Sequence, residues 1–103
     1  MQRIYLDHNA PTPIHPEVLK EMENALELTY GNASTLYLIG TEAKKKLEEA
    51  RGRVASLIGA KTEEIIFTGG GTEANNLALF GICRARKKEG NHIITSKIEH
   101  DSV

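Results

Sequence analysis

The sequence contains a single cysteine, Cys83, and only 5% aromatic residues. One cysteine excludes a disulfide within the chain and is typical of proteins from a reducing compartment. Few aromatic rings are available to stack on bases, and the formal net charge of -1 provides no excess positive charge for phosphate backbones. The composition therefore gives no support for a nucleic-acid partner.

Long apolar runs are also missing. No segment approaches the roughly 20 apolar residues that a membrane-spanning helix needs, and the N-terminus lacks the apolar run of a signal peptide. We therefore expect a cytoplasmic protein with no membrane partner. A length of 103 residues leaves room for one small domain with a modest core.

Metal binding has little support in the sequence. The four histidines show no close pairing of the kind that metal ligands need, and the single cysteine adds little to them. His15 is expected to lie at a helix start and His92 to be structural, and no role is assigned to His8. His100 is considered below with the site. The histidines are His8, His15, His92 and His100.

Three segments show the apolar spacing of amphipathic helices. Pro16 is suited to the first turn of the first helix, and Gly31 with Asn32 is expected to cap its C-terminus. Gly59 is expected to close the second helix, and Thr72 to cap the N-terminus of the third. The predicted helices are residues 16–30, 41–58 and 72–88.

Two short apolar segments, residues 64–68 and 92–95, flank the third predicted helix and are predicted to be strands. A strand, a helix and a strand in this order predict a right-handed βαβ unit and hence an α/β fold with a parallel sheet. Two strands do not form a viable sheet of this kind, which is normally covered on both faces. The sequence thus favours the beginning of a larger domain, with weak independent stability or a tendency to associate.

Three consecutive glycines, Gly69–Gly71, lie between the first predicted strand and the third predicted helix. They leave the backbone N–H groups at the helix start, and the positive end of its dipole, open to an anion such as phosphate. A tight turn without a ligand is the alternative interpretation. The position between strand and helix favours the phosphate site.

The same glycines fit a second binding pattern. Gly69-x-Gly71-x-x-Ala74 satisfies the dinucleotide fingerprint, with Glu99 further along as a candidate ribose-binding acid. His100 follows the C-terminal end of the second predicted strand, where ligands gather in parallel α/β sheets. Cys83 falls inside a helical pattern and is expected to be a buried small residue rather than a nucleophile.

Several separated motifs together resemble one known family. The motifs are Tyr5–Ala10, Gly31–Ser34, Glu64–Asn76 and Ile98–His100. In order and spacing they resemble the N-terminal part of the cysteine desulfurases of the NifS/IscS type, which belong to the class V aminotransferase-like group of pyridoxal-phosphate enzymes. The similarity covers essentially the whole chain.

The resemblance implies a fold and a set of site residues. It implies the beginning of the fold-type-I large domain, a βαβ unit preceded by helices and incomplete in this chain. Residues 1–15 would form an N-terminal arm, and residues 16–103 the N-terminal part of the cofactor-binding large domain. Gly71 and Thr72 would hold the phosphate of pyridoxal 5'-phosphate, and His100 would stack on its ring and assist proton transfer.

The resemblance also implies a reaction and partners. The parent protein would be a homodimer that converts L-cysteine to L-alanine and passes sulfur to an acceptor or iron–sulfur scaffold protein, for iron–sulfur cluster or thio-cofactor assembly. In family members the Schiff-base lysine, the acid paired with the pyridine nitrogen and the sulfur-accepting cysteine lie beyond the matched segment. We therefore expect the 103-residue chain alone to be inactive.

Three alternatives stay open at the level of sequence. The same family contains selenocysteine lyases and aminotransferases, which the N-terminal segment does not separate from desulfurases. An NAD-type dinucleotide-binding domain is a different class of enzyme part. A non-catalytic fragment that only binds or dimerises is a third class.

Overall fold

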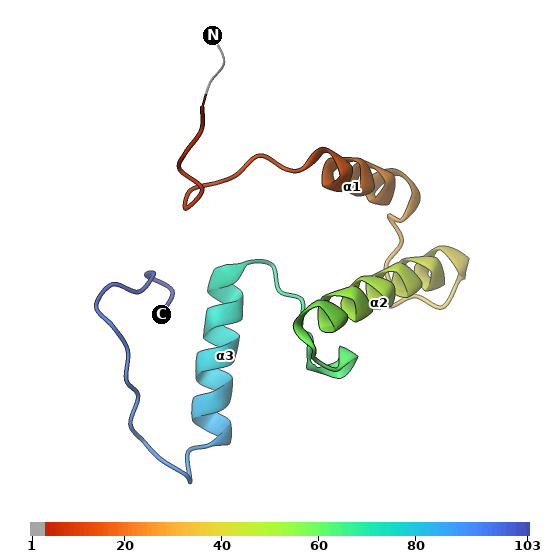
Figure 1. The fold of residues 1–103 in the computed structure, drawn as a ribbon. Coiled ribbons are helices and arrows are strands. Elements are labelled where there is room, and N and C mark those ends of the chain that lie inside the picture. The colour runs from red at the N-terminus through yellow and green to blue at the C-terminus, as the bar shows by residue number, and fades with distance from the viewer. Residues whose placement is uncertain (1–3) are drawn as a thin grey trace. The chain divides into compact units, whose positions relative to one another are not determined.

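The computed structural model describes residues 4–103, which form two compact units. The first unit runs to Thr62 and the second is Glu63–Val103. The regular elements are all helical (Figure 1): α1 Pro16–Leu28, α2 Leu38–Ile58, the 3₁₀ turn η1 Thr62–Glu64 and α3 Gly71–Ala85.

Residues 4–15 contain no helix or strand and are organised by a few local contacts. The Tyr5 hydroxyl donates a hydrogen bond of 2.7 Å to the carbonyl of Pro11, and the Tyr5 ring meets His8 edge-on at 5.4 Å between centroids. Residues 1–3 of the predicted arm lie outside the described residues. The division into residues 1–15 and 16–103 stays a prediction.

Helix α1 begins as the sequence predicts. Pro16 occupies its first turn, and His15 is the N-terminal cap, with its Nδ1 accepting a hydrogen bond of 3.3 Å from the Glu17 N–H. The predicted C-terminal cap is wrong, since Thr29 ends the helix by donating its N–H to the Ala25 carbonyl at 2.9 Å.

Asn32 instead builds the next turn. Its Oδ1 accepts from the Ser34 N–H at 2.9 Å, and its carbonyl accepts from both the N–H and the hydroxyl of Thr35, at 3.0 and 2.8 Å. Asparagine favours such forward bonds, which compete with helix capping. The turn leads directly into α2, which therefore begins at Leu38, three residues before the predicted start.

Gly40 in the first turn of α2 is buried against this loop. A Cβ atom there would overlap the Thr35 hydroxyl and come within 2.7 Å of the Asn32 carbonyl oxygen. Backbone atoms cannot yield as a flexible side chain can. Glycine is therefore required here by a close approach of two backbone segments.

Gly40→Ala is expected to destabilise the helical structure by about 1–3 kcal/mol, the usual cost of overpacking. Thermal melting followed by far-ultraviolet circular dichroism would measure it as a lower midpoint. Gly52→Ala is the matched control on the same helix, because a Cβ at Gly52 meets no atom within 4 Å. That change should stabilise by about 0.5–1 kcal/mol, and equal effects of the two variants would contradict the packing argument.

Helix α2 ends at the predicted residue. Gly59 adopts a left-handed conformation with φ of 68°, and the following Ala60 N–H bonds back to the Ala55 carbonyl at 2.9 Å. This is the Schellman arrangement, which favours glycine because other residues pay a steric cost at positive φ.

Helix α3 is one residue longer at its start than predicted and stops at Ala85, before the predicted Lys88. Arg86 donates its N–H to Ile82 and pairs through its guanidinium with Glu89 at 3.5 Å. This turn ends the helix and reverses the chain into residues 90–103.

The predicted βαβ unit is not confirmed, because no part of residues 4–103 is assigned to a strand. Glu64 belongs to η1, and residues 65–68 and 92–95 are irregular segments on either side of α3 (Figure 1). A strand requires a neighbouring strand about 4.8 Å away to form a ladder. Short apolar runs have a propensity for the strand conformation, but they do not by themselves provide the neighbouring strand.

The core of the described residues is very small. Among the apolar side chains, only Ala43 and Ala55 on α2 are buried. Larger apolar side chains of the same helix are not covered, and Leu57 is 84% exposed. Exposed apolar surface on this scale is in line with the expectation of weak independent stability or association.

Candidate functional site

The glycine turn before α3 is held by two side chains. The Thr68 hydroxyl donates to the Gly70 carbonyl at 3.1 Å, and the Gly69 N–H donates to Oε2 of Glu73 at 2.7 Å. Glu73 lies in the first turn of α3 and reaches back to Gly69, the residue before the helix cap. These two bonds fix the chain where it enters the helix.

Gly70, and not Thr72, is the N-terminal cap of α3. The prediction for Thr72 is wrong because the helix begins at Gly71, which places Thr72 inside the first turn. No side-chain hydrogen bond caps this end. The Thr72 hydroxyl therefore lies in the first turn of α3 and does not cap the helix.

The start of α3 offers unpaired donors to a ligand. The first intrahelical bond runs from the Ala74 N–H to the Gly70 carbonyl at 3.1 Å, so the N–H groups of Gly71, Thr72 and Glu73 precede the helical ladder. A Cβ atom at Gly70 or Gly71 would meet nothing within 4 Å. Open space, amide donors and the helix dipole together fit a phosphate group.

His100 lies in a tight turn that contacts α3. The Ser102 N–H donates to Nδ1 of His100 at 3.1 Å, and the Ser102 hydroxyl lies 2.9 Å from the same nitrogen. Asn75 on α3 donates from Nδ2 to the Ser102 hydroxyl oxygen at 2.8 Å. The bond joins residues 27 positions apart and brings the His100 turn to the helix that carries Gly71 and Thr72.

Sequence reasoning missed Asn75, Ser102 and Glu73. Only Ser102 had a local signal. A histidine ring can accept the N–H of the residue two positions ahead, as His15 does from Glu17 and His100 does from Ser102. The Asn75–Ser102 bond had no signal in the sequence, because it depends on how the chain returns along α3.

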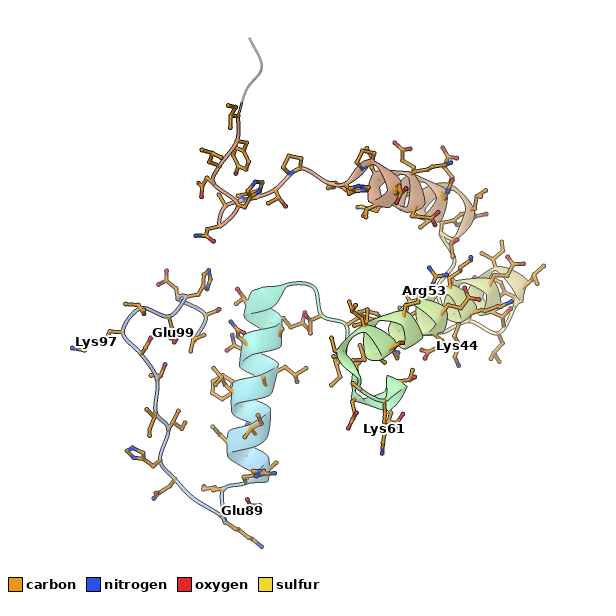
Figure 2. All side chains as sticks on the ribbon, viewed as in Figure 1. Lys44, Arg53, Lys61, Glu89, Lys97 and Glu99 are labelled. Atoms are coloured by element: carbon orange, nitrogen blue, oxygen red, sulfur yellow. The ribbon has the colours of Figure 1, made fainter. Side chains whose placement is uncertain are left out.

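Other residues considered from the sequence have local roles. Glu99 accepts a hydrogen bond of 2.8 Å from the Ser96 hydroxyl, and Figure 2 shows it with Lys97 on the segment that follows α3. Lys97 is exposed. Cys83 is also exposed, so the expectation that it is buried is wrong. The helix face that carries it has no sheet packed over it among the described residues.

A hollow of about 700 Å³ lies at the other end of α3. Its apolar lining comes from Leu79 and Ile82 on the helix and from Ile93 and Ile94 on the returning chain, with Lys87 among the polar residues. It is separate in sequence from the glycine turn. No group of three or more metal-binding side chains occurs in residues 4–103, and no helix there has the length and apolar character of a membrane span.

Comparison with known proteins identifies relatives along the whole chain. Cysteine desulfurase IscS of Buchnera aphidicola subsp. Schizaphis graminum is 50% identical over 103 residues, which cover 97% of this chain and 26% of the relative. Cysteine desulfurase IscS of Dictyoglomus turgidum is 47% identical over 102 residues, covering 99% and 26%. Selenocysteine lyase of Xenopus tropicalis is 46% identical over 113 residues, covering 98% and 26%.

The chain thus spans about a quarter of the length of the curated relatives it matches. The aminotransferase class-V family profile matches residues 4–103. The resemblance drawn from the separated motifs is confirmed by these matches. The chain belongs to the aminotransferase class-V family.

Proposed function

We propose that this chain is the N-terminal portion of a pyridoxal-phosphate-dependent cysteine desulfurase. The observation that carries the proposal is the open, amide-rich start of α3, in a chain about half identical to cysteine desulfurases over its whole length. The reaction would convert L-cysteine to L-alanine and release sulfur for transfer. A homodimer in the cytoplasm, with a sulfur acceptor or iron–sulfur scaffold protein as its partner, is part of the proposal.

The glycine turn would hold the cofactor phosphate. The amides of Gly71, Thr72 and Glu73 precede the helical ladder and can donate to phosphate oxygens, and the Thr72 hydroxyl can add a charge-assisted hydrogen bond. The Glu73 carboxylate accepts a hydrogen bond from the Gly69 N–H and so lies back across the glycine turn. The residues present therefore fit the phosphate group.

His100 would serve the reacting end of the site. An imidazole can stack on the cofactor ring and exchange a proton near neutral pH. When bound, pyridoxal phosphate supplies an electron sink for the substrate's bonds. The contribution of this chain is then to anchor the phosphate through Gly71 and Thr72 and to move a proton at His100.

A chimera tests the proposal, because the chain matches only about a quarter of its relatives. In this chimera, the present chain replaces the matching segment of the Dictyoglomus turgidum cysteine desulfurase IscS. We expect it to bind pyridoxal phosphate, seen as a visible absorbance band, and to release sulfide and alanine from L-cysteine. The unmodified relative is the control, and a folded chimera without the band or without sulfide release would contradict the proposal.

A selenocysteine lyase is the second candidate, because such an enzyme from Xenopus tropicalis matches the chain nearly as well. Comparing L-selenocysteine with L-cysteine as substrate would separate the two in the parent protein. The dinucleotide-binding alternative is not favoured, because Glu99 bonds to Ser96 in a local turn and no strand precedes the glycines among the described residues.

A further inference from the structure

The hydrogen bonds around His100 define which ring nitrogen is free. A backbone N–H can only donate, so the bond from the Ser102 N–H requires Nδ1 of His100 to be an acceptor. A neutral imidazole with an acceptor at Nδ1 carries its hydrogen on Nε2. The turn therefore selects one tautomer and leaves Nε2 for a ligand.

Asn75 extends this selection from α3. Its Nδ2 donates to the Ser102 oxygen, so the hydroxyl hydrogen of Ser102 is directed elsewhere, and Nδ1 of His100 lies 2.9 Å away to accept it. The lone pair of Nδ1 then lies within hydrogen-bond distance of two donors, the backbone N–H and the hydroxyl of Ser102. Asn75 and Ser102 are half-buried, which limits competition from water for these bonds.

We propose that Asn75 and Ser102 are positioning residues that fix the orientation and tautomer of His100, with Nε2 as the nitrogen that exchanges protons in the reaction. The proposal rests on the proposed function for its catalytic meaning. The hydrogen bonds that link Asn75 on α3 through Ser102 to Nδ1 of His100 do not require the cofactor.

Two other histidines in the chain provide matched references. His15 accepts a backbone N–H at Nδ1, from Glu17, without the added hydroxyl and amide. No hydrogen bond joins the His92 ring to any part of residues 4–103. The expected order of acceptor character at Nδ1 is therefore His100, then His15, then His92.

Nitrogen-15 NMR of the histidine-labelled 103-residue chain measures this order directly. At a pH of about 8.5 an ordinary imidazole is neutral, and the ring nitrogen shifts report the tautomer. Asn75→Asp is the decisive variant, because a carboxylate accepts the Ser102 hydroxyl hydrogen and withdraws it from His100. We expect Asn75→Asp and Ser102→Ala to move the His100 nitrogen shifts toward those of His15, and Ser102→Thr to retain them.

The His15 and His92 signals should stay in place in all three variants, which shows that the fold is retained. If the His100 shifts equal those of His92 in the unaltered chain, or do not respond to Asn75→Asp, the proposal is overturned.

The chimera supplies a second measurement that does not depend on the isolated chain. Ser102→Ala and Asn75→Asp are expected to lower kcat for sulfide release about 3- to 10-fold, a fraction of the ~10²-fold or more that a positioned acid–base group contributes. In Ser102→Ala, the KM for L-cysteine and the cofactor affinity should change less than about 2-fold, because the Ser102 side chain is assigned no ligand contact. Ser102→Thr should restore kcat, and an unchanged kcat in both variants would overturn the proposal. Loss of the cofactor band in the unaltered chimera would instead count against the proposed function.

Discussion

Thr72→Asp is expected to weaken the binding of pyridoxal phosphate to the chimera by about 100-fold. The new carboxylate would stand in the first turn of α3, where the phosphate is proposed to bind. Two unit charges about 4 Å apart repel by roughly 1–4 kcal/mol between bulk water and a partly shielded surface, and a phosphate carries more than one charge. An energy of about 2.7 kcal/mol corresponds to the stated factor. Titration of the visible cofactor band measures the affinity.

Two controls separate charge from hydrogen bonding. Thr72→Val removes the hydroxyl at almost constant volume and is expected to weaken binding about 10-fold, the value of one hydrogen bond to a charged group. Pyridoxal, which lacks the phosphate, should bind the Thr72→Asp and Thr72→Val chimeras equally well. If Thr72→Asp weakens pyridoxal as much as pyridoxal phosphate, the site assigned to the phosphate is wrong.

His100→Ala is expected to lower kcat for sulfide release from the chimera by about 100- to 1,000-fold, within the range for loss of general acid–base catalysis. Cofactor affinity should fall less than about 10-fold, because the phosphate contacts remain and only ring stacking is lost. Steady-state sulfide production and titration of the cofactor band measure the two effects separately.

His92→Ala is the matched control for this prediction. His92 lies on the same returning segment, beside the hollow at the far end of α3, and should be replaceable with little change in kcat. A large loss of cofactor affinity with normal kcat in His100→Ala would show that the ring only stacks. Such a result would remove His100 from the proton-transfer role.

The local features of the fold could be predicted because each depends on a few neighbouring residues. Pro16 fits only the first turn of a helix, and Gly59 adopts the positive φ that ends α2. Hydrogen-bond donors for an anion at Gly71 could also be predicted locally, because three glycines before an amphipathic helix expose its first backbone amides. The family could be recognised because motifs separated by tens of residues kept their order and spacing.

The failed predictions do not share one cause. Residues 92–95 have the composition of a strand, but a ladder requires a neighbouring segment and the described residues supply none to them. Asn32 is a residue type that can either cap a helix or form a turn. It forms a turn here, because it accepts hydrogen bonds from Ser34 and Thr35. Thr72 lost its role as a cap because the helix begins one residue earlier.

The sequence by itself determined the three helices, the glycine turn and the membership of the family. Helix periodicity and turn chemistry act over short distances, so they can be read along the chain. Only the tertiary structure joined Asn75 to Ser102 and so fixed Nδ1 of His100 as an acceptor. That contact exists because the chain returns along α3 after residue 90, and a bond across 27 positions leaves no periodic trace in the sequence.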